Sequence, residues 1–172
     1  MKTARRPHLV KRLAFGHGLA FCHRGALGFL GIGVIAAGLV IAAKGRASAP
    51  AGRYRVANGA VYDTKTKLTW QQSIPASTYA QSDAANYCAA LGLNGAMWRL
   101  PTGKELITLV DVSVAYPGPT LDSTAFPATP GDYFWSMTPF EGTPDNAWAV
   151  SFNYGGPDGY YTSALHYVRC VH

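Results

Sequence analysis

An apolar stretch at residues 25–43 limits what this chain can form, because its nineteen residues include no charged or strongly polar side chain. An apolar helix of roughly 20 residues spans the hydrocarbon core of a membrane, whereas a signal-peptide core usually has about 7–15 residues. Six Lys or Arg residues precede the stretch, and only Lys44 and Arg46 follow it closely. The positive-inside rule therefore predicts a basic cytoplasmic segment at residues 1–24, one hydrophobic helix, and an exported remainder.

The sequence leaves open whether this helix stays as a membrane anchor or is removed as a signal peptide. Its length and glycine content favour an anchor. Small residues with the spacing of a cleavage site follow it, in ASA at 47–49 and APA at 49–51. Cleavage after Ala51 is the better of the two options, because Pro50 follows the other cut. Residues 44–53 are predicted to be a linker, and residues 54–172 the exported domain.

The positive net charge of +6 belongs to the N-terminal fifty residues, which hold eight Lys or Arg and no acid. Residues 51–172 hold seven Lys or Arg against nine Asp or Glu, a net charge of −2. Such a domain lacks the basic patch that neutralises phosphates, so we expect no nucleic-acid partner.

Two of the three cysteines, Cys88 and Cys170, lie in the predicted exported domain. Two cysteines in an oxidising compartment most simply pair, and the alternative is a pair of buried free thiols. The predicted disulfide closes a loop of about 80 residues, which stabilises the fold by about 4–5 kcal/mol in the chain-entropy model.

The order of the predicted elements indicates an α+β fold with a small antiparallel sheet. Two strand-like runs occupy residues 54–72, with turns predicted at NG (58–59) and DTKTK (63–67). Helices are predicted to begin at Thr78 and Thr102, because each is followed three residues later by a Gln or Glu that completes a capping box. A loop rich in Pro and Gly follows at 112–132, and further strands are predicted at 133–138, 147–152, 160–164 and 166–171.

Several motifs occur in the order found in one protein family: LTW at 68–70, AANYCAAL at 84–91, WRLPT at 98–102 with EL at 105–106, WAVSFNYG at 148–155 and VRCV at 168–171. Over residues 56–172 the chain resembles the C-terminal domain of the Legionella collagen-like adhesin. It departs from that pattern at Met137, where a second Ser is usual, and at His172, which replaces a closing Arg. The resemblance implies a disulfide-tied, exported domain with a C-type-lectin-like fold, which formylglycine-generating enzymes also use.

The WRLPT motif offers both a chemical and a structural interpretation. Arg99 could bind a carboxylate or sulfate of a ligand, or its donors could be used by carbonyl groups and a nearby acid such as Glu105 or Asp111. Glu105 is better explained as the capping-box partner of Thr102 than as a general acid. We therefore predict that the motif is structural, and that Trp98, Trp135 and Trp148 belong to the core. The motif residues are Trp98, Arg99, Pro101, Thr102 and Glu105.

Turns near the C-terminus are the predicted ligand-binding surface, because tyrosines in turns can stack on sugars. The candidates are Tyr154, Asp158, Tyr160 and Tyr161. The sequence has no metal-binding motif, and no cofactor is expected. Calcium is a minor possibility, since oxygen-rich loops suit a hard cation, although turns need the same residues. The calcium candidates are Asp145, Asn146, Asn153 and Asp158.

The leading functional hypothesis is a non-catalytic extracytoplasmic recognition or adhesion domain that binds a glycan or a surface protein. It would contact the membrane through residues 25–43 if that segment is retained. One alternative is a structural or assembly module of the cell envelope. Another is an enzyme related to the formylglycine-generating group. Against catalysis, the chain has no G-x-S-x-G motif, and the resemblance assigns Cys88 and Cys170 to structural positions.

Overall fold

The computed structural model describes residues 49–172. The predicted hydrophobic helix at 25–43 and the basic segment before it lie outside the described residues. Within the part of the chain that is described, no helix is both long enough and apolar enough to cross a membrane.

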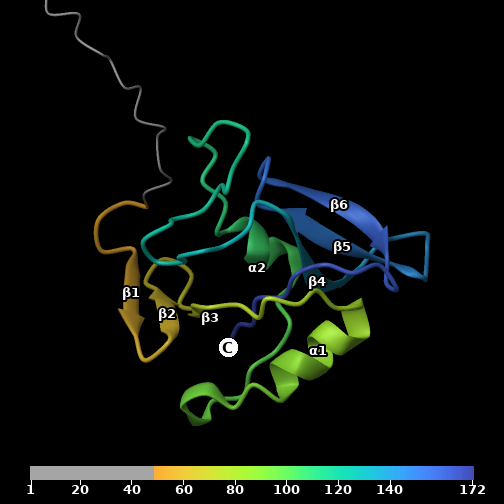
Figure 1. Ribbon diagram of the computed structural model, residues 1–172, viewed down its shortest axis with the longest axis horizontal. Helices are drawn as coiled ribbons and strands as arrows, with labels where there is room; N and C mark the ends of the chain where they lie inside the picture. Colours follow the sequence, from red (N-terminus) through yellow and green to blue (C-terminus); the bar gives the residue numbers. More distant parts are fainter. Residues whose placement is uncertain (1–48) are drawn as a thin grey trace, which may run out of the picture. The chain divides into compact units, whose positions relative to one another are not determined.

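Two antiparallel sheets of three strands each form the framework, which confirms the α+β class but replaces the expected single sheet (Figure 1). The first has the order β1-β2-β3, and the second has the order β4-β5-β6. Asn58 and Gly59 join β1 to β2, both with positive φ, as a two-residue hairpin turn requires. The strands are β1 (Tyr54–Ala57), β2 (Ala60–Asp63), β3 (Thr69–Gln71), β4 (Tyr133–Pro139), β5 (Asn146–Ser151) and β6 (Gly156–Tyr161).

The C-terminal segment joins the two sheets, running between them in Figure 1. Val171 forms antiparallel bridges with Trp70 of β3 and with Arg99, and Tyr167 bridges Phe134 of β4. The predicted strand at 166–171 is therefore wrong as a regular strand. The segment is extended, but its successive residues pair with different partners, so no continuous ladder forms.

Two helices and one short 3₁₀ turn cover the sheets: α1 (Gln81–Ala89), η1 (Leu93–Gly95) and α2 (Gly103–Ile107). The predicted start of the first helix at Thr78 is wrong, since its N-cap is Ala80 and no side chain caps it. The reason is a long-range pairing: Tyr79 and His166 exchange two backbone hydrogen bonds, of 2.9 and 3.0 Å. These bonds hold the chain extended at Tyr79, so the helix begins only afterwards.

The second sheet separates two hydrophobic clusters. Phe134 and Val150 belong to one cluster, together with Leu106 of α2. Trp135 and Ala149 belong to the other, together with Ala84 and Cys88 of α1. Because consecutive residues of a strand point to opposite faces, β5 is buried on both sides. The strand predicted at 147–152 is therefore present, at Asn146–Ser151, with both of its faces covered.

The loop at residues 112–132 completes the first cluster rather than standing free. Its side chains Leu121, Ala125 and Phe126 are buried there. The Thr120 backbone N–H donates to the carbonyl oxygen of Phe152 at 2.7 Å, which fastens the loop beside the end of β5.

The edge strand β6 begins and ends earlier than the sequence indicated. It spans Gly156–Tyr161, whereas the predicted strand was 160–164. Pro157 lies within it, which an edge strand tolerates because no neighbour needs its missing N–H. Asp158 therefore lies in a strand and not in a turn.

Candidate ligand-binding surface

The WRLPT motif forms the corner that leads into α2. The Thr102 hydroxyl accepts the Glu105 backbone N–H at 3.2 Å, and the Glu105 carboxylate accepts the Thr102 backbone N–H at 2.7 Å. This is the predicted capping box of α2. The two flanking side chains, Trp98 and Leu100, are buried, so Arg99 points the other way.

Arg99 pairs with Glu105, although its side chain remains 45% exposed. Its guanidinium donates to both carboxylate oxygens, at 2.9 and 2.6 Å. Hydrogen bonding to Arg99 is the main cause that lowers the pKa of Glu105 to about 2. The pair resembles the bidentate geometry in which arginine binds carboxylates most strongly. Glu105 therefore occupies the place that a ligand's carboxylate or sulfate would need.

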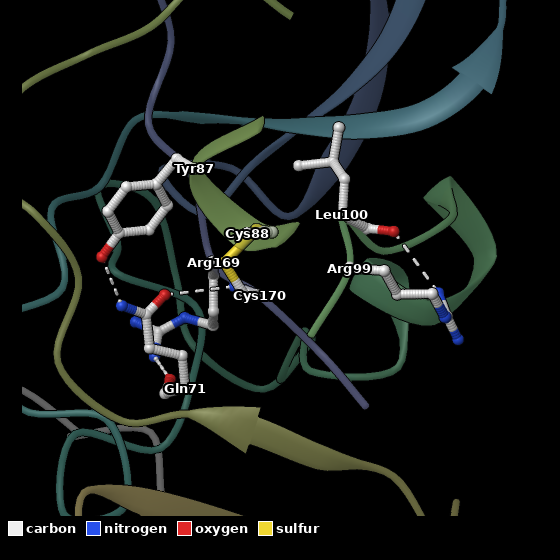
Figure 2. The surroundings of a disulfide bond; sticks show 7 residues. All are labelled: Gln71, Tyr87, Cys88, Arg99, Leu100, Arg169 and Cys170. Carbon is white, nitrogen blue, oxygen red and sulfur yellow. Dashed lines mark hydrogen bonds between the residues drawn. A yellow bond between two sulfur atoms is a disulfide. The ribbon is translucent and has the colours of Figure 1, made fainter. Parts of the chain in front are cut away.

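The predicted disulfide between Cys88 and Cys170 is present, with the two Cα atoms 5.4 Å apart (Figure 2). Both cysteines are buried. The Cys170 backbone N–H donates to the side-chain oxygen of Gln71 at 3.2 Å, and the Gln71 amide donates to the Tyr87 hydroxyl at 2.8 Å. The bond therefore ties α1 to the C-terminal segment beside β3.

Arg169 is a buried cation that the sequence interpretation missed. It is 0% exposed, and its guanidinium donates to the carbonyl oxygens of Gln71 and Gln72 and to the Thr129 hydroxyl (Figure 2 shows its place beside Gln71). It also lies 4.6 Å from the centre of the Phe126 ring. Burial lowers the pKa of Arg169 to about 9, which leaves it protonated at neutral pH. Its role is to join three segments inside the fold.

A tyrosine cluster lies on one face of the second sheet, where side chains of β4 and β6 meet across β5 beside the C-terminal segment. We define it as Tyr133, Tyr154, Tyr160 and His166. Tyr133 is at its centre, with ring centroids 6.1 Å from Tyr154, 4.7 Å from Tyr160 and 5.4 Å from His166. The Tyr154 side chain is 47% exposed, and the others are half-buried. The cluster therefore offers solvent both aromatic surface and hydroxyl groups.

The hydroxyl groups of this cluster interact, and those of Tyr133 and Tyr154 share a hydrogen bond. The Tyr133 and Tyr154 oxygens are 3.0 Å apart. Burial is the main cause that raises the pKa of Tyr154, and hydrogen bonding to Tyr133 is the main cause that raises the pKa of Tyr160. The Tyr154 and Tyr160 hydroxyls therefore remain protonated at physiological pH and can both donate and accept.

His166 forms the inner wall of the cluster. Its ring packs 4.5 Å from Tyr160 and 4.7 Å from Trp135, measured between centroids. Burial lowers the pKa of His166, and Asp132 opposes that shift. Its buried Nε2 atom makes no hydrogen bond within the described domain. The imidazole is therefore mainly neutral at neutral pH and holds the tyrosine rings in place by packing.

The structure brings together three of the four predicted ligand residues. Tyr160 and Asp158 lie two residues apart on β6, so they share one face of the sheet. The Tyr154 ring contacts the ring of Tyr133, which in turn contacts the ring of Tyr160. Tyr161 is 69% exposed and points to the opposite face, opposite Asn146 in the register. The register of β4 and the C-terminal segment adds Tyr133 and His166, which the local sequence pattern did not reveal.

The predicted calcium candidates do not converge on one point. Asp145 and Asn146 lie at the start of β5, and Asn153 lies beyond its other end. The strand between them, Asn146–Ser151, is itself about 17 Å long, far more than one coordination sphere. Within residues 49–172 no group of three or more His, Cys, Asp or Glu side chains is placed to hold a metal ion.

A hollow of about 330 Å³ lies beside the linker, away from the tyrosine cluster. Ala49, Arg53, Tyr54 and Asp122 contribute to its walls. The Ala49 backbone N–H donates to the Asp122 carboxylate at 2.7 Å, so the linker itself forms part of the hollow. Cleavage after Ala51 would remove that wall, and the hollow is for this reason the weaker candidate.

The observations above define a small α+β domain tied by a buried disulfide, a feature consistent with an extracytoplasmic location. The model of the Lcl C-terminal domain family matches residues 59–172, and the chain belongs to this family. No curated protein gives a match. Membership suggests a non-enzymatic extracellular domain.

Proposed function

We propose that the domain is a non-catalytic, extracytoplasmic recognition module that binds a glycan at the tyrosine cluster. The observation that supports this most is the linked arrangement of Tyr133, Tyr154 and Tyr160, which joins ring faces to hydroxyl groups in one exposed place. Sugars combine an apolar face of C–H groups with a rim of hydroxyls. Tyrosine matches both properties, because its ring is apolar and its hydroxyl exchanges hydrogen bonds.

The cluster is built as a rigid platform, which reduces the ordering cost of binding. His166 and Trp135 pack behind the tyrosine rings, and Trp135 is itself anchored by a hydrogen bond from its indole to the Tyr79 carbonyl, 2.8 Å long. A Cβ atom at Gly156 would lie 2.7 Å from the Tyr154 ring, so that ring rests directly on the backbone of β6.

The absence of catalysis is part of the proposal and has its own support. The best candidate for a general acid in the sequence, Glu105, is held by Arg99 and by the capping box. A group with a pKa of about 2 is a poor proton donor at neutral pH. The cysteines, which could otherwise act as nucleophiles, are joined to each other.

A glycan array probed with the full-length protein in detergent, with and without calcium, tests the proposal. We expect binding to a restricted set of glycans, lost in Tyr160→Ala and in Tyr154→Ala. Tyr161→Ala is the matched control, because its side chain is the neighbouring tyrosine on the opposite face of β6. If no glycan binds and a pull-down returns an envelope protein instead, the proposal is wrong and the assembly module takes its place.

A further inference from the structure

We infer that the tyrosine cluster selects a glycan carrying free amino groups over sulfated or uronic-acid-containing glycans. This inference rests on the proposed function and adds the charge class of the ligand. It follows from the acidic residues around the cluster and from where the cations of the domain are placed.

The first observation is a charge asymmetry along the chain. Residues 106–168 contain no Lys or Arg and hold six acids: Asp111, Asp122, Asp132, Glu141, Asp145 and Asp158. This range includes all three strands of the second sheet and the entire tyrosine cluster. No side chain from these strands can therefore supply a cation to a bound sulfate or carboxylate.

The second observation is that two of these acids lie at the cluster itself. Asp158 shares a face of β6 with Tyr160, and its charge raises the pKa of both Tyr154 and Tyr160. Asp132 directly precedes Tyr133, and its charge acts on Tyr160 and on His166. Both carboxylates are exposed, so a ligand at the rings would meet them.

The third observation is that most arginines of the described domain are either paired with an acid or buried away from the cluster. Arg53 pairs with Asp63 at 3.0 Å, and Arg99 pairs with Glu105 at 2.6 Å. Arg169 is buried beside Phe126, in the other hydrophobic cluster. The remaining cations lie on other elements. Arg55 is on β1, Lys65 and Lys67 follow β2, and Lys104 is on α2.

These features match the chemistry of an amino sugar. A protonated amine is attracted both to the carboxylates and to the faces of tyrosine rings, by the cation–π interaction. A sulfate would face two carboxylates without a compensating cation. Attraction between exposed charges weakens as salt shortens the Debye length, so the preference for an amine should decrease as the ionic strength rises.

Three oligosaccharides of equal length test the inference against full-length protein: fully deacetylated glucosamine oligomer, its N-acetylated form, and a sulfated oligomer. The pH is kept below the pKa of the sugar amine. At an ionic strength of about 0.01 M, we expect the deacetylated oligomer to bind about tenfold more tightly than the acetylated one. At about 1 M salt, where the Debye length is about 3 Å, most of that preference should vanish.

Variants separate specific selection from general attraction to an acidic protein. Asp158→Asn and Asp132→Asn should each reduce the preference for the amine severalfold while binding of the acetylated oligomer is kept. Glu141→Gln, an exposed acid in the β4–β5 turn, is the matched control and should leave the preference unchanged. An equal effect of all three variants would overturn the inference.

The outcomes also separate this inference from the proposed function. If the acetylated or sulfated oligomer binds at the cluster as tightly as the deacetylated one, the charge selection is wrong and glycan binding stands. If no oligomer and no array glycan depends on Tyr160, both are wrong.

Discussion

Arg99 and Glu105 are joined by two hydrogen bonds, of 2.9 and 2.6 Å, across the corner that leads into α2. The same carboxylate also accepts the Thr102 backbone N–H. A motif that contains Trp, Arg and Glu within eight residues has the composition of an active site. In this fold, however, its charged groups satisfy one another, and it fixes the entry of the helix.

Replacing Glu105 should destabilise the domain, and Ala should cost more than Gln. Glu105→Gln keeps an oxygen for the capping box and loses the ion pair, so we expect a cost of about 0.2–1 kcal/mol. Glu105→Ala also loses the bond that its carboxylate accepts from the Thr102 backbone N–H, which adds about 0.5–1.5 kcal/mol. Urea unfolding at neutral pH measures both, and equal costs would contradict the assigned double role.

Acid should reveal the same ion pair. Arg99 lowers the pKa of Glu105 to about 2, below its ordinary value of 4.5. The stabilisation is therefore complete above the ordinary value and is lost as the pH falls toward 2. We expect the difference in melting temperature between wild type and Glu105→Gln to shrink between pH 6 and about pH 2–3. A constant difference would show that the carboxylate charge contributes nothing.

The disulfide should carry a large share of the stability. The Cys88→Ala, Cys170→Ala double variant removes the link between two positions that are 82 apart in the sequence, and we expect a loss of about 2–5 kcal/mol. Denaturant unfolding with and without reductant measures it. Reductant should lower the midpoint of the wild type and leave that of the double variant unchanged. Labelling of Cys88 and Cys170 in unreduced, denatured protein would contradict the bond.

Arg169 should not be replaceable by lysine. One ammonium group cannot reach the Gln71 and Gln72 carbonyls and the Thr129 hydroxyl with the fork geometry of a guanidinium. A buried acceptor left without a donor costs about 1–3 kcal/mol, and we expect a loss in this range for Arg169→Lys. Arg55→Lys, at an exposed position of β1, is the control and should change the unfolding free energy by less than about 0.5 kcal/mol.

Gly118 should be intolerant of any side chain. A Cβ atom there would lie 2.1 Å from the Phe152 carbonyl oxygen, because the loop runs directly against the end of β5. Gly118→Ala should therefore cost about 1–3 kcal/mol or more by overpacking. Gly131→Ala is the matched control in the same loop, since its nearest contact is 3.4 Å away. Similar melting temperatures for the two variants would contradict the close approach.

The features that the sequence predicted correctly are either determined by neighbouring residues or have only one possible pairing. The Thr102 capping box and the Asn58–Gly59 turn are local, and each is determined by residues within three positions. Cys88 and Cys170 were the only two cysteines of the predicted exported domain, so their pairing had one solution. The tryptophans were correct in part: Trp98 and Trp135 are buried, but Trp148 is half-buried and packs against Phe140.

The features that the sequence missed depend on pairing between distant segments. Thr78 has the local pattern of a helix cap, but pairing of Tyr79 with His166 delays the helix. The same segment places His166 against Tyr160 and Tyr133, which completes the tyrosine cluster. Strand alternation could have separated Tyr160 from Tyr161, but only the register of β5 and β6 assigns each to a face.

The central claim is that the tyrosine cluster is the glycan-binding surface. The most direct test is calorimetric titration of one array-positive glycan into wild type, Tyr160→Ala and Tyr161→Ala, each shown by thermal unfolding to be folded. The account predicts that Tyr160→Ala binds at least about fivefold more weakly, since losing a stacked aromatic contact costs about 1 kcal/mol or more, while Tyr161→Ala binds as the wild type does. Equal affinities for Tyr160→Ala and wild type would contradict it.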